Sequence, residues 1–124
     1  MIILKLNLDS VRELLLDLEE NLNLVDTIEL NQENTSEDKL YAAMKLIEAG
    51  YIDGKIQRFM GGDFLIWIKS ITWEGHQFLD NIRPKTSWET SKKTASKIGG
   101  ASIKILSEIA AKITAELINN QLGY

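Results

Sequence analysis

The fold is decided by the stretch LIEAGYIDGKIQRFMGGDFLIWIK, which occupies residues 46–69. Its second half contains two runs, 55–60 and 64–69, in which β-branched and aromatic side chains recur. The link between them is Gly61-Gly62-Asp63, and a glycine-rich link between two such runs is a strong hairpin signal. In the first half Gly50 marks the end of a helical pattern. We therefore predict a helix that leads directly into a β-hairpin.

The helix before the hairpin is predicted to span residues 36–50. Ser36 is a favourable N-cap, and Glu37 and Asp38 suit the positive end of the helix dipole. Its predicted buried stripe consists of Leu40, Ala43, Met44 and Ile47, with Ala42 on the exposed side.

An earlier amphipathic helix is predicted to begin at Ser10, because Ser10 and Glu13 form a capping-box pattern. A short extended segment is expected near residues 25–30, before a polar turn. The apolar stripe of this first helix consists of Val11, Leu14, Leu15, Leu18 and Leu22.

Three helices are predicted after the hairpin. Thr72 caps a short helix to residue 82, with Trp73 on its apolar side and the lone histidine, His76, packed against the protein. A basic helix over 85–97 is anchored by Trp88 and Ala95. After a break at 99–100, Ser102 caps a long C-terminal helix to about residue 121.

The order of these elements is helix, short strand, helix, hairpin and further helices. A helix followed at once by a hairpin is typical of the winged helix, in which the helix enters the major groove and the hairpin contacts the backbone. We expect an α+β fold, a winged helix-turn-helix domain with a β-hairpin wing and a C-terminal helical extension. The winged-helix-like domain is expected over 1–83, with a basic helical segment and C-terminal helix over 84–124, in the same compact unit or as a dimerisation arm.

Two stretches also resemble known sequences. LIEAGYI at 46–52 is similar to the end of many winged-helix recognition helices, and ITWEGHQFLDNIR at 71–83, followed by Trp88, resembles the domain of unknown function 2513. The resemblance runs from Leu6 through the final helix. It implies a small phage- or prophage-associated protein with a winged-helix-like core, and implies no activity.

Charge is unevenly distributed along the 124 residues, whose net charge is −4. Residues 1–38 carry two basic and ten acidic side chains, whereas residues 83–104 carry six basic side chains and one acidic side chain. The basic segment therefore either faces phosphates or pairs with the acidic front half, within one chain or across a dimer.

The composition excludes several kinds of site. Cysteine is absent, so disulfides, thiolate zinc sites and a cysteine nucleophile are excluded, and a single histidine cannot build a multi-histidine centre. No apolar run approaches the roughly 18–20 residues of a membrane span, and the first residues do not form a signal peptide. We expect a cytoplasmic protein with no enzymatic activity, no cofactor, no metal and no membrane partner.

The leading functional prediction is a regulatory protein of phage or mobile-element origin that binds double-stranded DNA in a sequence-specific manner. Helix 36–50 would enter the major groove, and the hairpin and the basic segment would contact phosphates. The predicted DNA-binding residues are Ser36, Lys39, Tyr41, Lys45, Lys55, Arg58, Lys69, Arg83, Lys85, Lys92, Lys93 and Lys97.

A homodimer is also expected, because the apolar stripe of the last helix is too extensive to face water. Its predicted interface residues are Ile103, Leu106, Ile109, Ile113 and Leu117. The alternative function is a protein-interaction module, in which the acidic N-terminal half binds or inhibits a host protein. The acidic start of helix 36–50 favours this alternative.

Overall fold

The computed structural model describes residues 6–99 and 102–123 and has an α+β architecture, as predicted. The described residues form two compact units that meet in the sequence at Gly75 and His76. The elements are α1 (Leu8–Asn21), β1 (Ile28–Asn31), α2 (Glu37–Glu48), β2 (Ile52–Arg58), β3 (Phe64–Ile71), α3 (Trp73–Ile82), α4 (Lys85–Lys97) and α5 (Ile103–Leu122).

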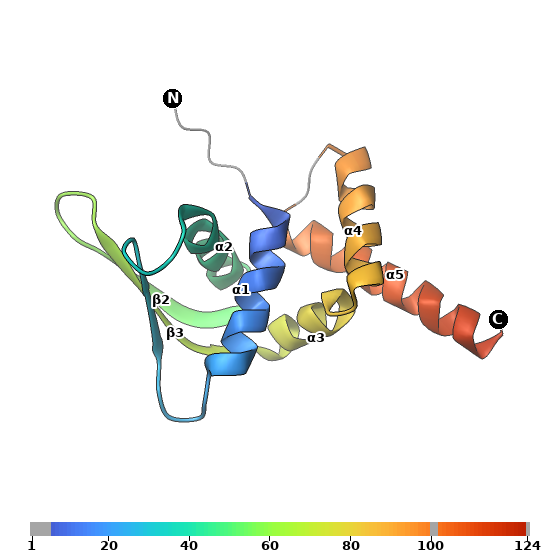
Figure 1. Cartoon of the computed structure of the whole chain (residues 1–124), viewed down its shortest axis with the longest axis horizontal. Helices are drawn as coiled ribbons and strands as arrows, with labels where there is room; N and C mark the ends of the chain where they lie inside the picture. Colours follow the sequence, from blue (N-terminus) through green and yellow to red (C-terminus); the bar gives the residue numbers. More distant parts are fainter. Residues whose placement is uncertain (1–5, 100–101, 124) are drawn as a thin grey trace. The chain divides into compact units, whose positions relative to one another are not determined.

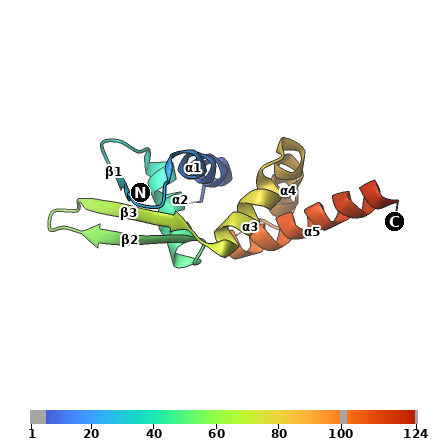
Figure 2. The ribbon, with the colours of Figure 1, turned by 90° about the horizontal axis from the view of Figure 1, so that it is seen from below.

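The first unit is built on a three-stranded antiparallel sheet in the order β1-β3-β2. The predicted hairpin is β2 and β3, and its tip extends away from α1 and α2 (Figure 2). The turn closes with the Phe59 amide donating to the Asp63 carbonyl oxygen at 2.9 Å, and Gly61 and Gly62 have φ values of 93° and 95°. These left-handed conformations explain why glycines occupy the turn. The first strand is displaced relative to the prediction, because β2 begins at Ile52 and ends before Phe59, whereas β3 begins at Phe64 as predicted and continues to Ile71.

The core face of the sheet lies against α1 and α2. Ile66, at the centre of β3, is fully buried and is paired with Leu30 on one side and Ile56 on the other. Because directly opposed residues share a face, these three side chains form one apolar row. Trp67 is paired with Glu29 and Lys55, so the opposite face carries polar and aromatic side chains.

The helix starts in this unit are set by capping side chains. Ser36 caps α2 as predicted, its hydroxyl accepting from the Lys39 amide. The capping box at Ser10 is wrong: Asn7 caps α1 by accepting from the Ser10 amide, and Ser10 is a buried residue inside the helix. Ala42 is fully buried, which corrects its predicted place on the exposed side of α2.

Residues 22–36, including β1, separate α1 from α2. The connection is therefore not the turn of about 3–4 residues that joins the two helices of a simple helix-turn-helix. Both helices pack on each other and on the sheet nonetheless (Figure 1).

The second unit contains the body of α3 together with α4 and α5, and α4 packs on α5 (Figure 1). Trp88 is 2% exposed and Ala95 is fully buried, which confirms both predicted anchors of α4. Ser102 caps α5 as predicted. Two expectations for α3 are wrong, because Trp73 is 73% exposed and His76 is exposed. Trp73 is the first residue of α3, and its side chain is not on the side that Phe78, Leu79 and Ile82 bury.

Candidate nucleic-acid interface

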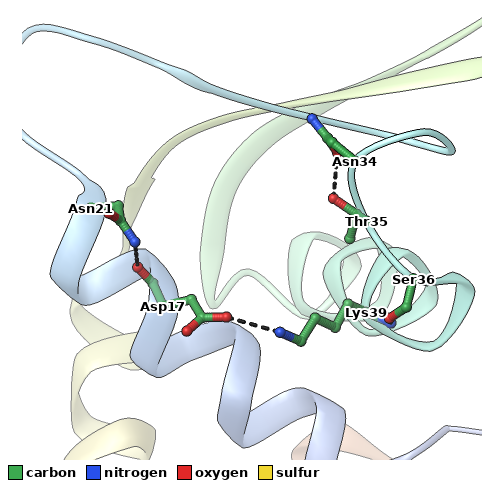
Figure 3. Close-up of polar contacts among 6 residues, drawn as sticks. All are labelled: Asp17, Asn21, Asn34, Thr35, Ser36 and Lys39. Atoms are coloured by element: carbon green, nitrogen blue, oxygen red, sulfur yellow. Dashed lines mark hydrogen bonds and ion pairs between the residues drawn. The ribbon is translucent and has the colours of Figure 1, made fainter.

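The structure separates the predicted DNA-binding residues into several groups. Those on α2 do not share one face. Ser36 holds the first turn of α2, and Lys39 reaches α1, where its ammonium lies 2.9 Å from a carboxylate oxygen of Asp17 (Figure 3). Both side chains therefore already have partners within the first unit, and Lys39 is directed to the neighbouring helix.

Tyr41 and Lys45 lie on another face of α2 and are brought together with Arg58 of β2. The three line a groove of about 600 Å³ between α2 and the hairpin. The groove also contains apolar side chains and two carboxylates, so its character is mixed. Its other lining residues are Gln32, Thr35, Glu37, Leu40, Met44, Glu48 and Phe64.

Lys45 has partners inside this groove. Its ammonium lies 3.0 Å from a carboxylate oxygen of Glu48 and 5.3 Å from the centre of the Tyr41 ring. The hydrogen bond to Glu48, followed by the Coulomb attraction of its carboxylate, raises the pKa of Lys45. Lys45 therefore stays protonated at neutral pH, and Glu48 offsets its charge locally.

Lys55 and Lys69 are exposed on the hairpin strands. Lys55 is opposite Trp67 in the register, so it lies on the face of the sheet away from α1 and α2, whereas Arg58 is opposite Phe64 on the groove side. The hairpin thus offers cations on two sides, and no single flat surface of the first unit collects them.

The most uniform basic surface is the exposed face of α4. Lys85, Lys93 and Lys97 are all exposed, and within the described part of the chain none of them forms an ion pair. Ser87, Trp88, Ser91 and Ala95 fill the opposite, buried side of the helix. The spacing of the lysines and of the buried residues along the helix places the two sets on opposite sides of α4. The lysines therefore point away from the buried side.

The remaining predicted cations of the second unit have local partners. The Arg83 guanidinium lies 3.0 Å from an Asp80 carboxylate oxygen. Lys92 lies 3.4 Å from a Glu89 oxygen and 5.7 Å from the centre of the Trp88 ring. Glu89 is the only acidic residue in α4, so the helix keeps an excess of positive charge.

Sequence reasoning missed the apolar lining of the α2 groove, namely Leu40, Met44 and Phe64. The helical pattern predicts Leu40 and Met44 as core residues, and Leu40 is indeed 3% exposed, but both also border the groove. No local signal places Phe64 beside α2, since that depends on how the hairpin packs.

Within 6–99 and 102–123, no group of three or more histidine, cysteine, aspartate or glutamate side chains is placed to hold a metal ion. No helix in these ranges has the length and apolar character needed to cross a membrane.

Comparison with known proteins gives one match. Neither a curated protein nor a solved structure matches the chain. A family model described as "Hypothetical protein (DUF2513)" matches residues 5–102, which includes α1 to α4 and ends just before α5. Since the match covers well over half of the sequence, the chain belongs to the DUF2513 family.

Proposed function

We propose that this protein is a winged-helix-like DNA-binding protein whose affinity for duplex DNA comes chiefly from the basic face of α4. The observation that carries the proposal is the row of exposed lysines, Lys85, Lys93 and Lys97, without ion-pair partners in the described chain. Unpaired lysines on one helix face are well suited to binding phosphates, because each lysine that neutralises a phosphate releases counterions from the DNA.

The first unit supports the winged-helix part of the proposal. Its element order, the strand order β1-β3-β2 and the projecting hairpin are compatible with a winged helix (Figure 2). In this proposal Arg58, Lys55 and Lys69 bind the DNA backbone from the hairpin. Four residues of the α2 segment were predicted to read bases. Ser36 forms a capping hydrogen bond, and Lys39 and Lys45 form ion pairs. In this proposal Tyr41 is therefore the main residue of α2 that contacts bases.

A regulatory role in a phage or mobile element is part of this proposal and rests on the resemblance described above. No catalytic step is proposed. The net charge of the first 38 residues is strongly negative, so this region disfavours non-specific binding to DNA. The electrostatic attraction to DNA therefore has to come from α4.

The experiment measures fluorescence anisotropy of labelled duplexes from the chain's own genomic neighbourhood, beside an unrelated duplex, at several salt concentrations. We expect sub-micromolar binding (Kd below about 1 μM) to one of these duplexes. Replacing Lys85, Lys93 and Lys97 with glutamine should reduce the slope of log K against log salt by about 2.7, or roughly 0.9 for each lysine that no longer neutralises a phosphate.

The matched control replaces the same three lysines with arginine, which keeps the charge and should keep the salt slope. If the wild-type protein binds no duplex at low salt, the proposed function is wrong. If it binds but the glutamine variant keeps the full slope, the DNA interface lies elsewhere than α4.

One observation favours the alternative, a protein-interaction module. The α2 groove has apolar lining residues, and the exposed Glu37 and Asp38 stand at the start of that helix. Such a surface fits a protein segment with an apolar side chain and a basic residue better than it fits phosphates. A photocrosslinking amino acid at position 41 tests it. The alternative predicts capture of one defined host protein, with loss of capture when Glu37 and Asp38 are replaced with lysine.

A further inference from the structure

The last helix, α5, has two apolar sides, of which only one is covered. Ile103, Leu106 and Ala110 are 4% exposed or less and face the chain's own interior. A second row follows four-residue spacing at Ile105, Ile109, Ile113 and Leu117. Ile105 is 43% exposed and Leu117 is 41% exposed, and the two isoleucines between them are half-buried.

A row of charges runs beside this apolar row. Each member of the apolar row is directly preceded by a charged residue, and these are Lys104, Glu108, Lys112 and Glu116. All four are exposed. Although they are four residues apart, none of the four is ion-paired in the part of the chain that the structure describes. Their charges are therefore available to groups outside the chain.

The order of these charges is self-complementary about the middle of the helix. When two copies of α5 are placed antiparallel around a two-fold axis near residue 110, Lys104 of one copy comes opposite Glu116 of the other. Glu108 then comes opposite Lys112. Every lysine meets a glutamate and every glutamate meets a lysine, which a parallel arrangement of the same row does not achieve.

The apolar row is centred on residue 111, one residue from the centre of the charged row, so one two-fold axis serves both rows to within one residue. In this arrangement Ile109 and Ile113 of the two copies meet near the axis, and Ile105 lies near Leu117 of the second copy. A two-fold interface uses one surface twice, so one helix suffices to supply both halves.

We propose that α5 is a homodimerisation helix that pairs antiparallel with α5 of a second copy through Ile105, Ile109, Ile113 and Leu117, flanked by the four charges. In both views the C-terminal half of α5 extends beyond α4, which leaves it accessible (Figures 1 and 2). Leu117, Ile118 and Leu122 are all exposed there, and such apolar side chains in a cluster mark interaction surfaces.

This proposal changes the interface expected from the sequence. The proposed interface keeps Ile109, Ile113 and Leu117 and adds Ile105. It leaves out Ile103 and Leu106, which are already buried in the chain's own core. The proposal does not depend on DNA binding, and α5 lies outside the residues that match the family model.

Sedimentation velocity of the full chain between about 1 and 100 μM, a range that brackets typical dimer Kd values, tests the proposal. We expect a dimer at the upper concentrations. Two charge variants are then made: K104E/K112E, whose row carries four glutamates, and E108K/E116K, whose row carries four lysines. Each should weaken self-association by about tenfold or more, since attraction becomes repulsion at every pair. An equimolar mixture should form a heterodimer.

The matched control is K85E/K93E, which makes the same charge change on exposed residues of α4 and should leave the dimer intact. Far-UV circular dichroism checks that all variants keep their helices. A wild-type chain that stays monomeric at the highest concentration overturns the proposal. So does a charge variant that dimerises as tightly as the wild type, or a mixture that fails to form the heterodimer.

Discussion

Gly75 lies so close to Tyr51 that a Cβ atom at position 75 would overlap the Tyr51 carbonyl oxygen. The same Cβ would also come within 2.8 Å of Cγ2 of Ile71. Hydrogen bonds hold this approach in place: the Gly75 amide donates to Thr72 Oγ1 at 3.1 Å, and Thr72 Oγ1 donates to the Gly50 carbonyl at 2.7 Å. The end of the α2 segment is thereby tied to the first turn of α3.

Replacing Gly75 with alanine should destabilise the protein by about 2 kcal/mol. Alanine gains about 1 kcal/mol in helix propensity over glycine, but overlap with a backbone atom costs about 1–3 kcal/mol or more and is the larger effect. Urea denaturation followed by circular dichroism measures the change. The control is Glu74→Ala, at the exposed neighbouring position, which should stay within about 0.5 kcal/mol of wild type.

Trp88 is the largest side chain buried in the second unit. Its replacement with alanine should lower the free energy of unfolding by about 3–5 kcal/mol. Apolar packing is lost, and the substitution also leaves a cavity that the surrounding helices fill only in part. Thr86→Ala, on the exposed side of the same helix, serves as the control and should be nearly neutral. A Trp88→Ala protein with wild-type stability would show that the second unit does not depend on this anchor.

The hairpin and the helix caps at Ser36 and Ser102 could be predicted because their signals are local. A glycine-rich turn between two strand-like runs, and a serine before a helical pattern, act through neighbouring residues. The start of α1 shows where such signals compete. Both Asn7 and Ser10 are good caps, and Asn7 is used, which leaves Ser10 inside the helix and buried.

The candidate site could be predicted only in part, because it depends on which face of a helix meets which neighbour. Lys39 and Lys45 are both on α2, but Lys39 bonds to Asp17 of α1, and Lys45 lies in the groove with Arg58. Charge and spacing do not distinguish these two lysines. Trp73 illustrates the same limit, because a helix of ten residues has too few apolar positions to define its buried side.

Ser36→Ala should lower stability by about 1 kcal/mol, because the Lys39 amide loses its acceptor at the start of α2. Ser36→Asp should retain stability, since aspartate also accepts this bond and favours the positive end of the helix dipole. Thermal unfolding of the two variants beside the wild type gives the comparison. An equal loss of stability in the alanine and aspartate variants would mean that the Ser36 hydroxyl does more than cap the helix.

The ion pair of Lys39 and Asp17 should couple α1 and α2 weakly. A double-mutant cycle with Lys39→Met and Asp17→Asn is expected to give a coupling free energy of about 0.2–1 kcal/mol, which decreases with added salt because both side chains are partly exposed.

Since Lys39 is directed to α1, Lys39→Met should leave the salt slope of DNA binding unchanged, whereas Lys93→Gln should reduce it by about 0.9. An equal reduction for both variants would mean that Lys39 leaves Asp17 and binds phosphate in the complex.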